Sequence, residues 1–170
     1  LLIQRRSTRL PLANAPVNSQ VAGRPYQVRA IRSIGKSLDS KERRALLVMA
    51  TGSGKTRTIV ALVDQLMKTN WVKRVLFLAD RTALVKQAAR AFTEHLPSVA
   101  TVNLVESKDT EGRVYVATYP TMRNLIEAGD RFGPGYFDLV IIDEAHRSVY
   151  AKYGAIFEWF DSLLVGLTAT

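Results

Sequence analysis

The stretch ALLVMATGSGKT, residues 45–56, decides the fold of this chain, because a short apolar run leads directly into a glycine-rich turn. A run of this length and composition, bounded by glycine, is typical of a buried strand. The residues that follow the turn show helical spacing, so we expect a helix to begin near Lys55. A strand, a glycine-rich turn and a helix in this order form the framework of a phosphate-binding loop.

The turn supplies the groups that bind phosphate. Gly52 and Gly54 permit positive φ, so that successive amides can face a β-phosphate together with the amides and dipole of the new helix. Lys55 would reach the β- and γ-phosphates, and the hydroxyl of Thr56 would complete a Mg²⁺ shell. The full consensus has glycine where this sequence has Met49, and a turn that only caps a helix is the alternative. The predicted nucleotide contacts here are Thr51, Gly52, Ser53, Gly54, Lys55 and Thr56.

Further apolar runs alternate with amphipathic segments along the chain. The runs predict strands over 45–50, 75–79, 114–118, 139–143 and 164–168, with a weaker candidate over 100–105. The segments predict helices over 26–38, 55–69, 82–95, 121–128 and 151–161. This alternation indicates a three-layer α/β domain with a mainly parallel sheet, in which ligands collect at the carboxyl ends of the strands.

Residues 1–23 show no period and contain Pro11 and Pro16, so we expect an irregular lead-in or linker before a single domain over 24–170. The chain has no cysteine, which excludes disulfides and thiolate metal sites. Its apolar runs fall far short of the ~20 residues of a membrane span, and we expect a cytoplasmic protein without membrane contact. The net charge of +9 favours polyanionic partners. We expect four aromatic side chains to lie in the core: Trp71, Phe157, Trp159 and Phe160.

Two acids follow the apolar strand of FDLVIIDEAHRS, residues 137–148. Asp143 would hold Mg²⁺, through water, and Glu144 would orient and deprotonate an attacking water. The alternative, that such acids only cap a turn, loses weight because a phosphate loop lies upstream on a separate strand. His146 would sense the γ-phosphate, unless it is a plain surface histidine. The last strand ends in two hydroxyl residues, Thr168 and Thr170.

Together these motifs resemble a known family. Residues 52–56, 143–146 and 168–170 are similar, in order, to motifs I, II (the DEAH type) and III of superfamily 2 helicases, and the resemblance spans 24–170. It implies a RecA-like P-loop NTPase domain that uses ATP and Mg²⁺. Lys55, Asp143 and Glu144 would then be catalytic, and Thr168 and Thr170 would couple the nucleotide state to the rest of the motor.

The resemblance extends to three shorter segments. RPYQ, residues 24–27, is similar to the segment of the family that reads adenine, which implies a base-edge contact by Gln27 and packing roles for Arg24 and Tyr26. FLADRTAL (77–84) and VATYPTM (116–122) are similar to motifs Ia and Ib, which lie on the nucleic-acid face of the family. The implied nucleic-acid contacts are Arg81, Thr82 and Thr118. From the residues alone, an ordinary first helix turn explains Arg81 and Thr82 equally well.

Within the superfamily, the chain looks most like the restriction (motor) subunit of type I restriction-modification systems. That resemblance implies translocation on duplex DNA, an upstream nuclease domain, modification and specificity subunits as partners, and a second RecA-like domain. An arginine finger from such a domain is worth roughly 10³ to 10⁵ in turnover, so we expect this stretch alone to hydrolyse ATP poorly. The alternatives are another superfamily 2 motor (a repair or remodelling translocase, or an RNA helicase) and a nucleotide-dependent binding switch.

Overall fold

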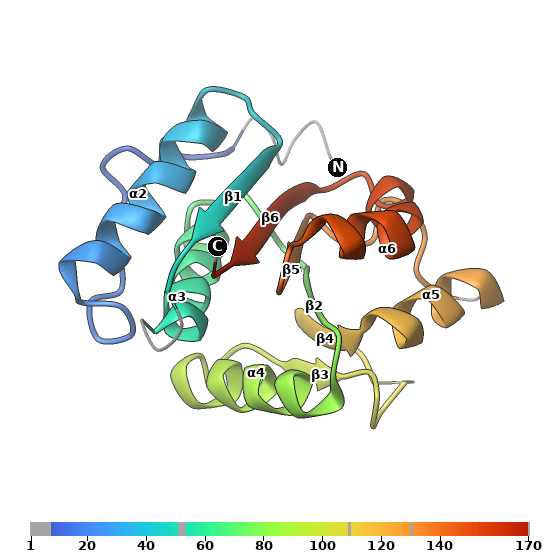
Figure 1. The fold of residues 1–170 in the computed structure, drawn as a ribbon. Helices are drawn as coiled ribbons and strands as arrows, with labels where there is room; N and C mark the ends of the chain where they lie inside the picture. The colour runs from blue at the N-terminus through green and yellow to red at the C-terminus, as the bar shows by residue number, and fades with distance from the viewer. Residues whose placement is uncertain (1–7, 51–53, 109, 130, 170) are drawn as a thin grey trace.

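The computed structural model describes residues 8–50, 54–108, 110–129 and 131–169. Within these residues, six parallel strands form one sheet in the order β1-β6-β5-β2-β4-β3 (Figure 1). The strands are β1 (Arg44–Val48), β2 (Val75–Ala79), β3 (Thr101–Asn103), β4 (Val114–Thr118), β5 (Leu139–Ile142) and β6 (Leu163–Thr168). The helices are α2 (Pro25–Asp39), α3 (Lys55–Lys68), α4 (Thr82–His95), α5 (Tyr119–Ala128) and α6 (Arg147–Trp159). The predicted three-layer α/β class is confirmed.

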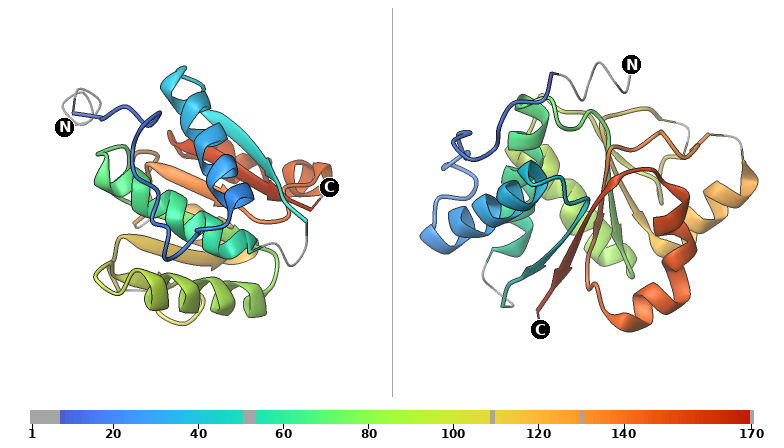
Figure 2. Two further views of the ribbon diagram at one scale, coloured as in Figure 1. Left: turned by 90° about the vertical axis from the view of Figure 1, so that its left-hand side faces the viewer. Right: turned by 90° about the horizontal axis from the view of Figure 1, so that it is seen from above.

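The direction in which the chain crosses the sheet decides which face each helix covers. The chain first moves from β1 toward the β3 edge through α3 and α4, and it then returns to β6 through α5 and α6. Right-handed crossovers in opposite directions place their helices on opposite faces. Accordingly α2, α3 and α4 pack side by side on one face, and α5 and α6 pack together on the other (Figure 2).

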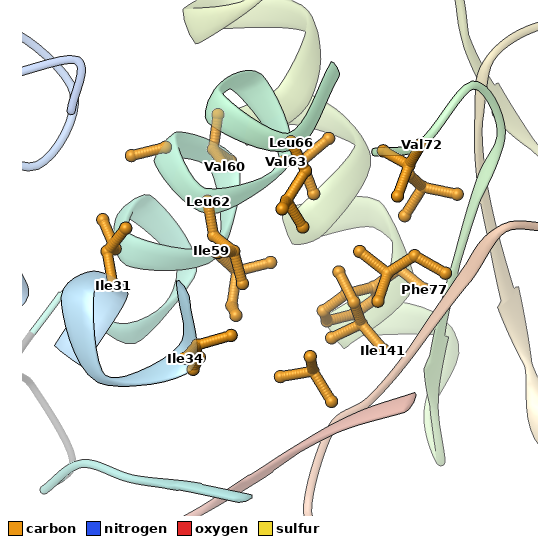
Figure 3. Close-up of a cluster of buried hydrophobic side chains, with 14 of the residues drawn as sticks. Ile31, Ile34, Ile59, Val60, Leu62, Val63, Leu66, Val72, Phe77 and Ile141 are labelled. Carbon is orange, nitrogen blue, oxygen red and sulfur yellow. The ribbon is translucent and has the colours of Figure 1, made fainter. Parts of the chain in front are cut away.

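The helix that follows the phosphate loop is the most deeply buried of the described helices. Nine consecutive residues of α3, from Thr58 to Leu66, are buried, because this helix lies between α2 and α4 and also covers the sheet. Figure 3 shows Ile59 and Leu62 of α3 facing the same apolar cluster as Ile34 of α2 and Phe77 of β2. A second cluster, rich in aromatic residues, fills the space between the sheet and the α5–α6 layer.

The largest deviation from the predicted boundaries is the start of α6, and the start of α5 and the ends of β1, β3 and α6 deviate less. Helix α5 begins at Tyr119 rather than at 121, because the side chain of Thr118 caps it by accepting a hydrogen bond from the Thr121 amide. Helix α6 begins at Arg147 rather than at 151, directly after the extended residue His146, and it ends at Trp159 rather than at 161.

The core prediction for the four aromatic residues was right for three. Trp71, Phe157 and Phe160 are buried, whereas Trp159 is 41% exposed. Trp159 is the last residue of α6, and its indole N–H donates to the carbonyl of Phe132 while part of the ring stays in contact with solvent. Among the described helices, none is long and apolar enough to cross a bilayer.

Residues 8–23 contain no helix or strand, yet they are packed against the domain. Leu12 is 1% exposed, and its amide donates to both carboxylate oxygens of Asp39 at 3.1 Å. Arg32 donates to the carbonyl of Ala15, and the indole N–H of Trp71 donates to the carbonyl of Leu10 at 2.8 Å. We propose that this segment folds as part of the domain and is not a free linker.

Two leucines of this segment provide a test. Leu12→Ala is expected to lower the free energy of unfolding by about 2–5 kcal/mol, because it leaves a cavity against α2. Leu10→Ala, at a side chain that is 52% exposed, is expected to change it by less than about 0.5 kcal/mol. Urea denaturation measures both values. An equally small loss for Leu12→Ala would show that the segment does not contribute to the core.

Candidate nucleotide-binding site

Three sequence motifs meet at the carboxyl edge of the sheet. The chain leaves β1 for the glycine-rich loop, leaves β5 at Asp143, and ends β6 at Thr168. Strand β6 lies between β1 and β5 and pairs with both, with Val48 opposite Thr168. This order brings segments that are about 90 residues apart in the chain to one place, and three predicted residues therefore become neighbours.

Lys55 lies against both predicted acids. Its Nζ atom is 3.1 Å from Asp143 Oδ1 and 3.4 Å from Glu144 Oε1. Burial alone would lower the pKa of Lys55, but the hydrogen bond and charge of Asp143, with the charge of Glu144, outweigh it and raise the pKa above its ordinary value. Lys55 therefore stays charged at neutral pH, as a residue that binds phosphate must.

The turn that carries the acids has an unusual backbone. Glu144 adopts φ of 55°, a conformation that costs a residue other than glycine on the order of 1–3 kcal/mol. Hydrogen bonds hold the turn in place: Glu144 N donates to Asp143 Oδ1 at 3.0 Å, and Ala145 N donates to the carbonyl of Leu167 at 2.7 Å. The structure thus fixes where the Glu144 side chain starts.

His146 connects this turn to β6. Its Nε2 atom is 2.8 Å from Glu144 Oε2, and its Nδ1 atom is 3.4 Å from the Thr168 hydroxyl. Burial would raise the pKa of Glu144, but the hydrogen bond from His146 and the charge of Lys55 lower it below its ordinary value. Glu144 is therefore an ionised acceptor at neutral pH. The predicted roles of His146 and Thr168 stay predictions. His146 contacts both Glu144 and Thr168, so the two predicted residues are neighbours.

The start of α2 contacts the phosphate loop. Gln27 is 4% exposed; its Nε2 atom donates to the carbonyl of Gly54 at 3.3 Å, and its Oε1 atom accepts from the amide of Arg24. The Arg24 side chain donates to the hydroxyl of Tyr26 at 2.9 Å. These three residues stand together beside the loop, and their predicted adenine contacts stay predictions.

The groups around Asp143 suit magnesium. Mg²⁺ prefers oxygen ligands and usually takes one or two from the protein, with phosphates and water supplying the rest. The carboxylate of Asp143 faces the first turn of α3, where Lys55 meets it and Thr56 carries the adjacent hydroxyl. Among the described residues, no group of three or more histidine, cysteine or acidic side chains is arranged so that it could hold a metal ion by itself. A hard cation held by few protein oxygens therefore fits this edge.

The predicted nucleic-acid residues lie along the same edge of the sheet. Arg81 precedes the first residue of α4, Thr82, and both side chains are exposed. Thr118 is 8% exposed, and its hydroxyl both caps α5 and donates to Thr121 Oγ1 at 2.9 Å. Its contact with nucleic acid stays a prediction. Four predicted site residues lie outside the described residues: Thr51, Gly52, Ser53 and Thr170.

One neighbour of the site was not predicted. The hydroxyl of Tyr119 donates to the main-chain carbonyl of Asp143 at 2.8 Å. A main-chain acceptor 24 residues away has no sequence signature, so sequence reasoning could not find this contact.

This fold and site define a class of protein: the first RecA-like domain of superfamily 2 helicases and translocases, an α/β domain with its phosphate loop, DEAH acids and last-strand hydroxyls at one sheet edge. The family model described as "Type III restriction enzyme, res subunit" matches residues 20–170. The chain belongs to this family.

Two relatives of this chain are endonuclease subunits of type I restriction enzymes. The EcoAI endonuclease subunit of a type I restriction enzyme of Escherichia coli is 35% identical over 86% of this chain and 19% of its own length. The EcoKI endonuclease subunit of Escherichia coli K12 is 28% identical over 93% of this chain and 16% of its own length. This chain therefore spans less than a fifth of either relative.

Solved structures share the fold. The Hef helicase domain of Pyrococcus furiosus matches with a TM-score of 0.68 and 27% identity, over 91% of this chain and 35% of that one. The SWI2/SNF2 ATPase core of Sulfolobus solfataricus, solved with double-stranded DNA, matches with a TM-score of 0.72 over 96% of this chain and 34% of that one. Its identity is 16%, so this likeness concerns the fold alone.

The contact between Gln27 and the loop can be tested at two glycines. Gly54 has φ of 79°, and an added Cβ would lie 2.5 Å from Gln27 Nε2, whereas Gly129 has φ of 74° with nothing within 4 Å. Gly129→Ala should cost about 1–2 kcal/mol of unfolding free energy through backbone strain alone. Gly54→Ala should cost about 1 kcal/mol more, because Gln27 must also give up its hydrogen bonds.

Urea denaturation in a Gln27→Ala background completes the comparison. There the two glycine substitutions should become equally costly, since the clash is gone. If Gly54→Ala still costs more unfolding free energy than Gly129→Ala without the Gln27 side chain, a contact other than Gln27 accounts for the difference.

Proposed function

We propose that this chain is the ATP-binding motor domain, over residues 24–170, of an ATP-dependent DNA translocase, the restriction (motor) subunit of a type I restriction-modification system. The observation that carries the proposal is the convergence of Lys55, Asp143 and Glu144 within 3.4 Å at the carboxyl edge of the sheet. A cation at a phosphate loop opposite two acids is the arrangement that phosphoryl transfer to water requires.

Each residue has a distinct task in this mechanism. Lys55 binds the β- and γ-phosphates and exchanges its carboxylate neighbours for phosphate oxygens. Thr56 and Asp143 hold Mg²⁺, which when bound offsets the charge of the phosphates. The glycine-rich loop, with Thr51, Gly52 and Ser53, supplies main-chain and hydroxyl donors. Arg24, Tyr26 and Gln27 flank the adenine base of ATP.

Glu144 is the general base in this proposal. Its lowered pKa keeps it ionised, so that it can accept a proton from the attacking water. His146 engages one carboxylate oxygen, Oε2, and so limits the rotation of the carboxylate. The other oxygen, Oε1, faces Lys55 and hence the γ-phosphate side.

His146 also gives the site a route to the remainder of the motor. It lies between Glu144 and the Thr168 hydroxyl, so a change at the γ-phosphate can reach the end of β6, where Thr168 and Thr170 form the proposed coupling segment. Arg81 and Thr82, at the exposed start of α4, and Thr118 would contact backbone phosphates of duplex DNA. In the parent protein we expect a second RecA-like domain, a nuclease domain, and modification and specificity subunits as partners.

The role of Glu144 is tested by Glu144→Gln in the full-length protein. Turnover should fall by roughly 10²–10⁴-fold, because the amide cannot accept a proton, while ATP still binds within a few-fold of its original affinity. Steady-state ATP hydrolysis and equilibrium nucleotide binding measure the two effects. Glu158→Gln, at an exposed glutamate of α6, is the matched control and should leave both unchanged. Retained hydrolysis in Glu144→Gln would remove Glu144 from this role.

The motor function is tested by the ATPase rate of the full-length protein without nucleic acid, with duplex DNA, and with single-stranded RNA. We expect stimulation by duplex DNA, with an apparent affinity that falls steeply as salt rises, because backbone phosphates carry the contact. Stimulation by RNA alone would replace the translocase with an RNA helicase. Nucleotide binding without stimulation by either nucleic acid would instead favour a binding switch.

A further inference from the structure

Tyr119 occupies a position that its place in the sequence does not explain. It is the first residue of α5, it is fully buried, and its hydroxyl donates a 2.8 Å hydrogen bond to the carbonyl oxygen of Asp143. Burial, followed by the charge of Asp143, raises the pKa of Tyr119 well above its ordinary value. The hydroxyl therefore remains a donor throughout the working pH range.

The Tyr119 ring packs against two aromatic rings of α6. It stacks on Tyr153 of α6 with a centroid distance of 4.9 Å and meets Phe157 edge-on at 6.1 Å. Aromatic pairs in these geometries have preferred orientations, so the ring cannot tilt freely. Any shift of the first turn of α5 must therefore move the hydroxyl with it.

The acceptor of this hydrogen bond belongs to the peptide that sets the direction of Glu144. This peptide joins Asp143 to Glu144; its carbonyl accepts from Tyr119, and its N–H donates to Asp143 Oδ1. Both polar ends of one peptide plane are thus fixed, immediately before a residue with φ of 55°. Loss of the Tyr119 contact frees one end of that plane and lets Glu144 change direction.

The same tyrosine follows the proposed DNA-contact residue Thr118, whose hydroxyl caps α5. A nucleic-acid phosphate at Thr118 would accept the hydroxyl proton that Thr118 now donates to Thr121 Oγ1, and the first turn of α5 would shift in response. Because Tyr119 is in that turn, the displacement would reach the Asp143–Glu144 peptide through one hydrogen bond.

We propose that Tyr119 is a positioning residue that couples nucleic-acid contact at the start of α5 to the orientation of Glu144 in the ATP site. This inference rests on the proposed motor function. It assigns the residue a regulatory task distinct from binding either ATP or DNA.

The test is Tyr119→Phe in the full-length protein, which removes only the hydroxyl. The ratio of the DNA-stimulated to the basal ATPase kcat should fall at least about fivefold, because the hydrogen bond that links the first turn of α5 to the Asp143–Glu144 peptide is lost. The KM for ATP and the affinity for duplex DNA should stay within about twofold. A purely structural role would not produce this split between kcat and KM.

The matched control is Tyr115→Phe. Tyr115 is fully buried, lies near the opposite end of β4, and its hydroxyl is 2.6 Å from that of Tyr136 and accepts from the amide of Gly112. Tyr115→Phe removes the same atom from β4, the strand that leads into α5, at a site away from the acids, and the stimulation ratio should be retained. An equal fall of the stimulation ratio in both variants would mean that losing either buried hydroxyl loosens the domain as a whole. That result would overturn the coupling role.

The response of the wild-type protein to DNA distinguishes a failure of the coupling role of Tyr119 from a failure of the proposed motor function. If duplex DNA stimulates the wild type and Tyr119→Phe keeps the full ratio, the role of Tyr119 is overturned and the motor function stands. If DNA does not stimulate the wild type, the proposed motor function fails, and the coupling role fails with it.

Discussion

The contact of the Lys55 ammonium with the carboxylates of Asp143 and Glu144 is the interaction around which the candidate site is organised. The cation comes from the loop after an edge strand, and the acids come from a strand two places away in the sheet. Only with β6 inserted between β1 and β5 do the two ends lie at this distance. The same insertion brings the Thr168 hydroxyl within 3.4 Å of His146 Nδ1.

The two proposed substrates approach a single edge of the sheet. The phosphate loop follows β1 on one side, while the starts of α4 and α5 follow β2 and β4 on the other. The acids lie between them, after β5. A short chain of contacts, rather than a long rearrangement, is therefore enough to connect DNA and ATP, and a buried tyrosine hydroxyl is suited to carry it.

Sequence reasoning succeeded where the physical signal was local. Fully buried parallel strands appear as apolar runs, and 75–79 and 114–118 were predicted with the observed bounds. The juxtaposition of Lys55 with the acids followed from the rule that parallel strands present their carboxyl ends at one edge. Helix starts were missed at α5 and α6, because polar caps interrupt the period. Tyr119 was missed because its partner is a main-chain oxygen, which every residue possesses.

The nine buried residues of α3 divide the domain into parts of unequal stiffness. The helix that carries Lys55 is enclosed by two helices and the sheet, whereas α5 and α6 each bury only two residues. Segments with few buried apolar contacts open at lower free energy. We therefore expect α3, the proposed phosphate-binding helix, to stay fixed, and any motion within this domain to occur in the layer of α5 and α6.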